Sequence, residues 1–404
     1  MKRIDRNNYL DWLIRWKEKQ IIKVVSGVRR CGKSTLFEIY RDYLLQNGVD
    51  RTQIIMINFE DIDYEHLTNY RELYDYIKTR ILPEKMNYIF LDEVQHVAQF
   101  EKAVDSLFLK KNYDVYITGS NAYFMSGELA TLLSGRYVEL KMLPLSFKEF
   151  CTAFEDKTTL SIKDKFNLYM ENGSFPYTAR LEQKSREVKE YLNDIYNSVL
   201  LKDIVARLNI SDVANLENIT KFLLHNIGSK VSPIKIANTL KSAGKSIDQK
   251  TVDKYIHGLT DSLLLYEAIR YNIKGKQFLT TQSKYYAVDV GIRNMLVKSK
   301  ETDTGHILEN IVYLELLRRG NKVYVGQLED SEVDFVAIDS SAVSYFQIAA
   351  STLDEETLKR ELAPFKKISD NYPKYLLTLD EVFGSANYEG IQKMNVLDWL
   401  LGET

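Results

Sequence analysis

An α/β fold with a mostly parallel sheet is predicted for the N-terminal third of this 404-residue chain. A β-branched run at residues 21–26 leads into a glycine-rich stretch, and a helical pattern then continues to about residue 47. Four further strand-like runs, separated by helical segments, lie at residues 54–59, 87–92, 114–118 and 137–140. This alternation is typical of α/β domains. The remaining residues predict an α-helical region that contains a winged helix, followed by an α+β domain.

The composition is that of a globular protein. Apolar residues make up 45% of the chain and charged residues 27%, and the formal net charge is −2, which excludes a strong overall field for recruiting nucleic acid or anionic membrane. Cys31 and Cys151 are the two cysteines, too few for a disulfide framework. The N-terminus has no apolar core for a signal peptide, and no apolar run approaches the ~20 residues of a membrane span. We therefore expect a cytoplasmic protein without membrane contact.

The glycine-rich stretch S-G-V-R-R-C-G-K-S-T predicts a phosphate-binding loop. It contains Gly27-x-x-x-x-Gly32-Lys33-Ser34 between a predicted strand and a predicted helix. Glycines let backbone N–H groups converge on phosphate oxygens, and the N-terminus of the helix adds a positive dipole end. Lys33 is predicted to reach the β and γ phosphates, and Ser34 to offer its hydroxyl to Mg²⁺.

Two acids end the strand at residues 87–92. Asp92 is predicted to hold Mg²⁺ together with Ser34, and Glu93 to polarise an attacking water molecule. An adjacent acid pair favours hydrolysis over transfer to a bound acceptor. The alternative is a pair of exposed acids that merely end a strand.

Three residues further along are candidates for contact with the γ phosphate. Ser120 and, as second choice, Asn121 follow the strand at residues 114–118, where they would lie beside the end of the Asp92 strand; the alternative is a capped loop. Arg136 precedes the last strand and is a candidate arginine finger, acting in cis or in trans. A surface arginine or a structural ion pair is the other interpretation of Arg136.

Residues 211–294 predict a winged helix. Three helical patterns, at residues 216–226, 233–243 and 248–264, precede strand patterns at residues 265–271 and 284–288. Ser232 is expected to cap the second helix, with Pro233 at its first position. Double-stranded DNA is a candidate partner, and the alternative is a protein-packing module. The predicted DNA-contacting residues are Gln249, Lys250 and Lys254 on the third helix and Lys274 and Lys276 on the wing.

The segment at residues 295–404 resembles the restriction-endonuclease-like core, with a helix, a hairpin, a further strand and a second helix. Glu309, Asp334 and Gln347 match the acidic helix position and the two strand positions of that core. Ala349 stands where the resemblance requires the catalytic lysine, and Lys359 is a weak substitute. The resemblance therefore implies a degenerate nuclease site whose fold serves binding or assembly, with Asp334 and Glu332 as residual or structural acids.

The whole chain resembles the bacterial and archaeal AAA-family ATP-binding proteins that carry a C-terminal domain of unknown function. The resemblance rests on G-V-R-R-C-G-K-S-T, F-L-D-E-V-Q, T-G-S-N, L-S-G-R-Y and, further on, G-S-F-P, Y-Y-A-V-D-V-G-I-R-N, the G-H-I-L-E-N helix and S-E-V-D-F-V-A. It implies ATP and Mg²⁺ as cofactors. The implied ATP-binding residues are Gly27, Val28, Arg29, Arg30, Cys31, Gly32, Lys33, Ser34, Thr35 and Asn121.

We expect four regions: an AAA-like P-loop ATPase core at residues 1–144, a helical lid or connector at 145–210, the winged helix at 211–294 and the restriction-endonuclease-like domain at 295–404. The leading hypothesis is an Mg²⁺-dependent ATPase that works as a nucleotide-driven switch, with DNA as one candidate target. The alternatives are an ATP-dependent binding module with little turnover, which recognises a protein or DNA, and an ATP-gated nuclease, which Ala349 disfavours. An arginine finger acting in trans would require an oligomer.

Overall fold

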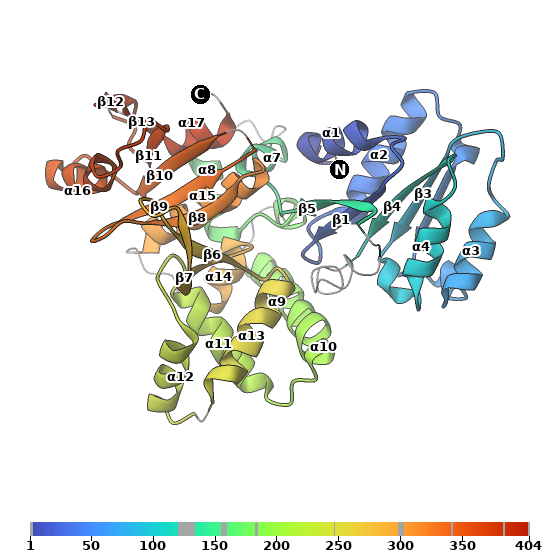
Figure 1. Cartoon of the computed structure of the whole chain (residues 1–404), viewed down its shortest axis with the longest axis horizontal. Coiled ribbons are helices and arrows are strands. Elements are labelled where there is room, and N and C mark those ends of the chain that lie inside the picture. Colours follow the sequence, from blue (N-terminus) through green and yellow to red (C-terminus); the bar gives the residue numbers. More distant parts are fainter. Residues whose placement is uncertain are drawn as a thin grey trace. The chain divides into compact units, whose positions relative to one another are not determined.

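The computed structural model describes residues 3–119, 133, 135–154, 160–181, 185–245, 247–297, 303–340, 342–382 and 384–402. Its contacts divide the chain into two compact units (Figure 1). The first unit comprises residues 1–144 with 261–263, and the second comprises residues 145–260 with 264–404. The chain thus leaves the first unit after Pro144.

The first unit is built on five parallel strands in the order β2-β3-β4-β1-β5. The strands are β1 (Ile22–Gly27), β2 (Ile54–Asn58), β3 (Asn87–Asp92), β4 (Tyr113–Thr118) and β5 (Tyr137–Met142). Among its described residues, the helices are α1 (Asn7–Trp16), α2 (Lys33–Gln46), α3 (Tyr70–Lys78) and α4 (Phe100–Phe108), with short η1 (Arg51–Gln53), η2 (Ile62–Tyr64) and η3 (Val94–His96). All five predicted strands are therefore present.

Helices cover both faces of this sheet, so β1 and β3 are buried along their whole length. On one face, α3 and α4 pack through Leu73, Ile77 and Val104 against the aliphatic side chains of the strands. On the other face, α2 places Phe37 in edge-on contact with Phe90 of β3. Because all five strands are parallel, their carboxyl ends lie at one edge of the sheet, and the residues that follow them are brought together there.

The second unit begins with helices and ends in a mixed sheet. Its helices before the sheet are α7 (Phe147–Thr152), α8 (Ile162–Asn172), η4 (Thr178–Arg180), α9 (Ser185–Ser198), the π-helical η5 (Val199–Val205), α10 (Ala206–Leu208), α11 (Val213–His225), α12 (Pro233–Ser242) and α13 (Gln249–Asp261). As expected, Ser232 caps α12 by accepting a hydrogen bond from Lys235 N, and Pro233 opens the helix.

Eight strands form the second sheet, in the order β12-β13-β11-β10-β9-β8-β6-β7. They are β6 (Leu265–Asn272), β7 (Gln277–Ala287), β8 (Lys322–Gln327), β9 (Glu332–Ile338), β10 (Val343–Ala349), β11 (Lys374–Thr378), β12 (Ala386–Tyr388) and β13 (Ile391–Asn395). The accompanying helices are α14 (Val290–Leu296), α15 (Thr304–Arg318), α16 (Glu355–Lys366) and α17 (Val396–Leu401).

The hairpin predicted as a wing belongs to this sheet. β6 and β7 pair antiparallel, and β6 also pairs in parallel with β8, where Arg270 lies opposite Val325. The boundary predicted at residues 294/295 therefore falls between strands of one continuous sheet rather than between two compact units. α15 packs near Phe335 on one face, and α16 packs near Val336 on the other, since successive side chains of a strand point to opposite faces.

Asp289 joins two of the sequence motifs, G-S-F-P and V-D-V-G. Its carboxylate accepts hydrogen bonds from Ser174 N at 2.5 Å and from Ile292 N at 3.0 Å. A Cβ on Gly173 would lie 2.1 Å from Asp289 Oδ1, so the close approach requires glycine. Both motifs are thus explained by a buried contact between the end of α8 and the start of α14.

Within the described part of the chain, no helix combines the length and the apolar character needed to cross a membrane.

Candidate functional site

The predicted phosphate loop lies at the carboxyl edge of the first sheet, between β1 and α2. Gly27 begins it in close contact with β5: a Cβ there would lie 2.5 Å from Met142 O and 2.8 Å from Cys31 Sγ. Gly32 ends it with a φ of 106°, a left-handed conformation that favours glycine, immediately before the first turn of α2. Both glycines of the motif are therefore required by the backbone path. The loop delivers the chain directly to a helix N-terminus, which favours a bound anion.

Lys33 is buried beneath this loop. Its Nζ donates to Gly27 O at 3.2 Å and lies 3.5 Å from Glu93 Oε1. Burial acts to lower the pKa of Lys33, but neighbouring negative groups, including the carboxylate of Glu93, outweigh burial and raise it above its ordinary value. Lys33 thus keeps its positive charge at the point where the loop can receive a phosphate.

Asp92 ends β3 beside the end of β4. Its carboxylate accepts hydrogen bonds from the hydroxyls of Ser34 and Thr118. Burial raises the pKa of Asp92, although these hydrogen bonds oppose the shift. The structure therefore brings Ser34 and Asp92, the predicted Mg²⁺ ligands, into direct contact. A hydroxyl and a carboxylate are oxygen donors of the kind that Mg²⁺ prefers, and Mg²⁺ at phosphate sites needs only one or two protein ligands.

Glu93 adopts a left-handed backbone conformation, with a φ of 57°. This conformation, which costs a non-glycine residue energy, places Glu93 Oε1 near Lys33, while Gln95 Nε2 donates to Glu93 Oε2 at 2.5 Å. Burial acts to raise the pKa of Glu93, but the charge of Lys33 and the hydrogen bond from Gln95 hold it below its ordinary value. Glu93 is consequently a buried carboxylate at neutral pH.

Thr118 is a site residue that the sequence reasoning passed over in favour of Ser120 and Asn121. Its buried hydroxyl donates to Asp92 and accepts a hydrogen bond from Glu93 N at 2.9 Å, so it fixes both acids. The signal was present in the sequence, because Thr118 is the last residue of a strand predicted to lie next to the Asp92 strand. Ser120 and Asn121 lie outside the described residues.

The arginines of the prediction lie in different environments. Arg29 Nη1 is 3.9 Å from Glu60 Oε1, and Arg30, with a φ of 66°, is exposed at the loop tip. Arg136 precedes β5, and its guanidinium lies 3.5 Å from Asp105 and packs over the ring of Phe108. Since β5 runs parallel to β1, Arg136 is at the edge of the sheet opposite the phosphate loop. It is therefore not brought to the site, and it cannot reach a phosphate bound by its own loop.

The comparisons with known proteins agree with this geometry. A family model described as an AAA domain matches residues 19–151, and a model described as a domain of unknown function (DUF8612) matches residues 163–303. An uncharacterized protein of Haemophilus influenzae is 40% identical over 400 residues, which make up 98% of each chain. The chain belongs to this AAA-domain family.

A second relative, an uncharacterized protein of Methanocaldococcus jannaschii, is 31% identical over 396 residues, covering 93% of this chain and 85% of that protein. Among solved structures, a Walker-type ATPase of Pyrococcus abyssi aligns with a TM-score of 0.51 at 14% identity, covering 73% of this chain and 96% of the other. This structural likeness shows the fold alone. The predicted α/β P-loop fold and the AAA-family resemblance are confirmed.

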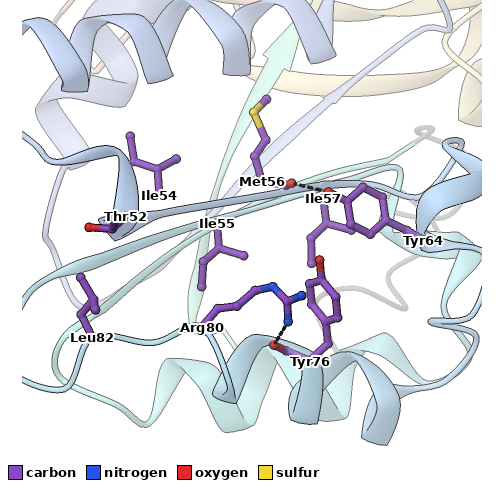
Figure 2. Close-up of a pocket in the computed structure, with 9 residues that line it drawn as sticks. All are labelled: Thr52, Ile54, Ile55, Met56, Ile57, Tyr64, Tyr76, Arg80 and Leu82. Atoms are coloured by element: carbon purple, nitrogen blue, oxygen red, sulfur yellow. Dashed lines mark hydrogen bonds between the residues drawn. The ribbon is translucent and has the colours of Figure 1, made fainter.

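A pocket of about 400 Å³ lies elsewhere in the AAA domain, at the outer edge of its sheet (Figure 2). It is bounded by edge strand β2 and by the aromatic rings of Tyr64 and Tyr76, with Arg80 stacked 3.4 Å from the centroid of the Tyr76 ring. In the sheet order, β2 is separated from β1 by β3 and β4. This pocket is therefore distinct from the phosphate loop.

The three residues of the predicted degenerate nuclease site do lie together in the second unit. Asp334 N donates a hydrogen bond to Gln347 Oε1 at 3.3 Å, and Glu309 of α15 lies nearby. Ala349 is buried at the end of β10, and Lys359 is exposed and pairs with Glu355 on its own helix, so neither supplies a cation.

A lysine that the sequence did not predict occupies this cluster. Lys284 of β7 places its Nζ 2.9 Å from Glu309 Oε1, 2.7 Å from Glu332 Oε1 and 3.9 Å from Asp334 Oδ1. The expectation that the cluster lacks a lysine was based on the strand positions of the nuclease core. The structure corrects it, since β7 joins the same sheet and delivers the ammonium from another part of the chain.

Among the described residues, no group of three or more His, Cys, Asp or Glu side chains is arranged to hold a metal ion.

The predicted DNA-contacting residues are divided in their availability. Gln249 and Lys250 are exposed at the start of α13, and Lys276 is exposed in the turn of the hairpin. Lys254 Nζ donates to Leu208 O at 2.9 Å, and Lys274 pairs with Glu329 at 2.9 Å. Both of these lysines have partners within the protein, so the DNA surface, which stays a prediction, depends mainly on Lys250 and Lys276.

Proposed function

We propose that this AAA-family protein binds and hydrolyses ATP in an Mg²⁺-dependent reaction. The observation that carries the proposal is the convergence of Lys33, Asp92, Glu93 and Thr118 at one edge of a parallel sheet, next to a glycine loop that opens a helix. A lysine, a metal-binding carboxylate and a second carboxylate positioned to orient water are the parts that phosphoryl transfer to water requires.

Each residue has a role in this proposal. The backbone N–H groups of the loop and Lys33 bind the phosphates of ATP, and Ser34 and Asp92 would hold Mg²⁺, which offsets the charge that develops on the phosphate oxygens. Glu93, ionised at neutral pH, accepts a hydrogen bond from water and orients it for attack on the γ phosphorus. Thr118 fixes Asp92 and the backbone of Glu93, so that both acids keep their positions during the reaction.

The pairing of Lys33 with Glu93 gives the proposed site the properties of a switch. A phosphate group that attracts Lys33 competes with Glu93 for its ammonium, so ATP binding frees Glu93 to face water. Release of phosphate restores the pair. We propose that this exchange is passed on to the second unit as a nucleotide-dependent change.

Nucleotide binding is the direct test of the proposed site. The dissociation constant for ATP is measured by isothermal titration calorimetry, with Mg²⁺ and with EDTA, for the wild-type chain, Lys33→Ala and Lys85→Ala. Lys85 is an exposed lysine of the same unit and serves as the matched control. We expect Mg²⁺-dependent binding that Lys33→Ala weakens at least tenfold and Lys85→Ala leaves unchanged. A wild-type chain that binds no nucleotide would refute the proposal.

Double-stranded DNA is a second candidate ligand, favoured by the order α11, α12, α13, β6, β7 and by exposed Lys250 and Lys276. Binding to a fluorescent 30-base-pair duplex at two salt concentrations is expected to weaken in the double variant Lys250→Glu/Lys276→Glu. Lys359→Glu, an exposed lysine on α16, is the control. Equal binding by both variants would point instead to a protein-packing role for these helices.

Arg136 could act only on a neighbouring copy, so an arginine-finger role requires an oligomer.

A further inference from the structure

Arg6, just before α1, is a buried arginine that the sequence analysis did not single out. Its guanidinium donates to three backbone carbonyls in two distant segments. Nη1 donates to Cys31 O at 3.1 Å, inside the phosphate loop, and Nη2 donates to Leu143 O at 2.7 Å and to Pro144 O at 3.4 Å. These two segments are the phosphate loop and the residues at which the chain leaves the first unit.

The contact with Cys31 bears on the direction of a loop N–H group. In a trans peptide the carbonyl of Cys31 and the N–H of Gly32 point in opposite directions, so holding the carbonyl also sets the N–H. Gly32 has a φ of 106° and carries no Cβ, so the peptide before it could otherwise rotate at little cost. Arg6 thus fixes the orientation of the Cys31–Gly32 peptide within the proposed phosphate-binding loop.

The contact with Leu143 is reinforced by the neighbouring turn of α1. Leu143 N donates to the hydroxyl of Tyr9 at 3.1 Å, and the guanidinium carbon of Arg6 lies 4.8 Å from the centroid of the Tyr9 ring. Both backbone groups of Leu143 are therefore held by the start of α1. Met142, the preceding residue, is also the one whose carbonyl approaches Gly27 at the other end of the loop.

We infer that Arg6 is a positioning residue that couples the phosphate loop to the exit of the chain from the ATPase unit. Through it, a change in the Cys31–Gly32 peptide on nucleotide binding is transmitted to Leu143 and Pro144, and the reverse. The guanidinium suits this role because its planar donors can serve two carbonyl groups at once, which an ammonium on a flexible stem does less well. The inference rests on the proposed function, since it concerns the same nucleotide site.

The test compares Arg6→Met, Arg6→Lys and Arg3→Met. Arg3 is the matched control because it pairs with Asp42 at 2.8 Å on α2 and is partly exposed. ATP affinity is measured with Mg²⁺ well below each melting temperature, where the dissociation constant of a folded population does not report stability. We expect the dissociation constant for ATP to increase at least tenfold in Arg6→Met and by a smaller factor in Arg6→Lys. In Arg3→Met it should stay within twofold of the wild-type value.

Hydrogen exchange gives the second readout. ATP is expected to slow amide exchange in the peptide covering residues 139–147 of the wild-type chain and to have no such effect in Arg6→Met. An Arg6→Met chain with wild-type affinity and wild-type protection would overturn the inference. If that variant does not fold, Arg6→Lys decides, and wild-type values for both measurements overturn it. A wild-type chain that binds no ATP would instead defeat the proposed function itself.

Discussion

Replacing Lys284 by methionine tests whether its ammonium holds the second unit together. The side chain is 6% exposed and lies among the carboxylates of Glu309, Glu332 and Asp334, at the distances given above. Breaking a buried pair by removing one partner costs about 3–5 kcal/mol, because the remaining charge is left uncompensated. We therefore expect Lys284→Met to lower the free energy of unfolding of the second unit by about 4 kcal/mol at neutral pH.

The deficit in the free energy of unfolding of Lys284→Met, relative to the wild-type chain, will depend on pH in a defined direction. Burial acts to raise the pKa of Glu309, but Lys284 outweighs it and holds this pKa below its ordinary value. Without the ammonium, burial raises the pKa of Glu309 above its value in the unfolded chain. The folded variant then binds more protons than the unfolded one, so its stability increases as the pH falls. The deficit relative to the wild-type chain is thus smaller at pH 5 than at pH 8.

Urea denaturation at pH 5 and pH 8 measures both effects. Lys274→Met is the matched control: Lys274 lies between the strands of the same hairpin and pairs with Glu329 at 2.9 Å, but both side chains are about four-fifths exposed. An exposed pair contributes at most about 1 kcal/mol, so this control is expected to stay close to the wild-type chain. A pH-independent deficit below about 1 kcal/mol for Lys284→Met would refute the reasoning.

Three further predictions concern the two units separately. Thr118→Val leaves Glu93 N without its buried acceptor, which costs about 1–3 kcal/mol, and will lower kcat for ATP by about tenfold or more. Thr118→Ser keeps the hydroxyl and will stay within about threefold of the wild-type kcat. Equal rates for both variants would contradict this. Lys23→Met will destabilise the first unit by about 3–5 kcal/mol because it leaves the buried carboxylate of Asp114 without its cationic partner. The double variant Lys23→Met/Asp114→Leu is expected to recover at least half of that lost stability, as measured by thermal melting. Burial acts to raise the pKa of Asp380, but hydrogen bonds from Lys393, Ser351 and Thr352 outweigh it and lower this pKa to about 2. The wild-type chain therefore loses stability as the pH falls from about 4 to 2. In Asp380→Asn the urea midpoint is expected to fall less steeply with decreasing pH over this range.

The phosphate loop and the five strands of the first sheet were predictable because their signals are local. Gly27, Gly32, Lys33 and Ser34 lie within eight consecutive residues, and each strand is a short apolar run. Thr118 was within reach of the same reasoning, since the ends of neighbouring parallel strands meet at one edge. The same rule places Arg136, which precedes a parallel strand, at the opposite edge from the loop.

Other features of the two units depend on contacts between residues that are distant in the sequence. Arg6 reaches the carbonyl of Leu143, and Lys284 reaches Glu309 and Glu332, only because the chain folds back on itself. The continuous sheet across residue 294 arises from parallel pairing of β6 with β8, and parallel pairing has no turn signal in the sequence. A hydrophobic pattern identifies strands but does not state which strands are neighbours.

ATP turnover measures the proposed activity most directly. Phosphate release is followed at saturating ATP and Mg²⁺ for the wild-type chain, Lys33→Ala and Glu93→Gln, with and without duplex DNA. We expect steady turnover by the wild-type chain, and loss of turnover with at least tenfold weaker ATP binding in Lys33→Ala. In Glu93→Gln we expect near wild-type ATP affinity with turnover reduced about a hundredfold, in line with the loss of a general base. ATP binding without turnover in the wild-type chain, or wild-type turnover in Glu93→Gln, would contradict the proposed mechanism.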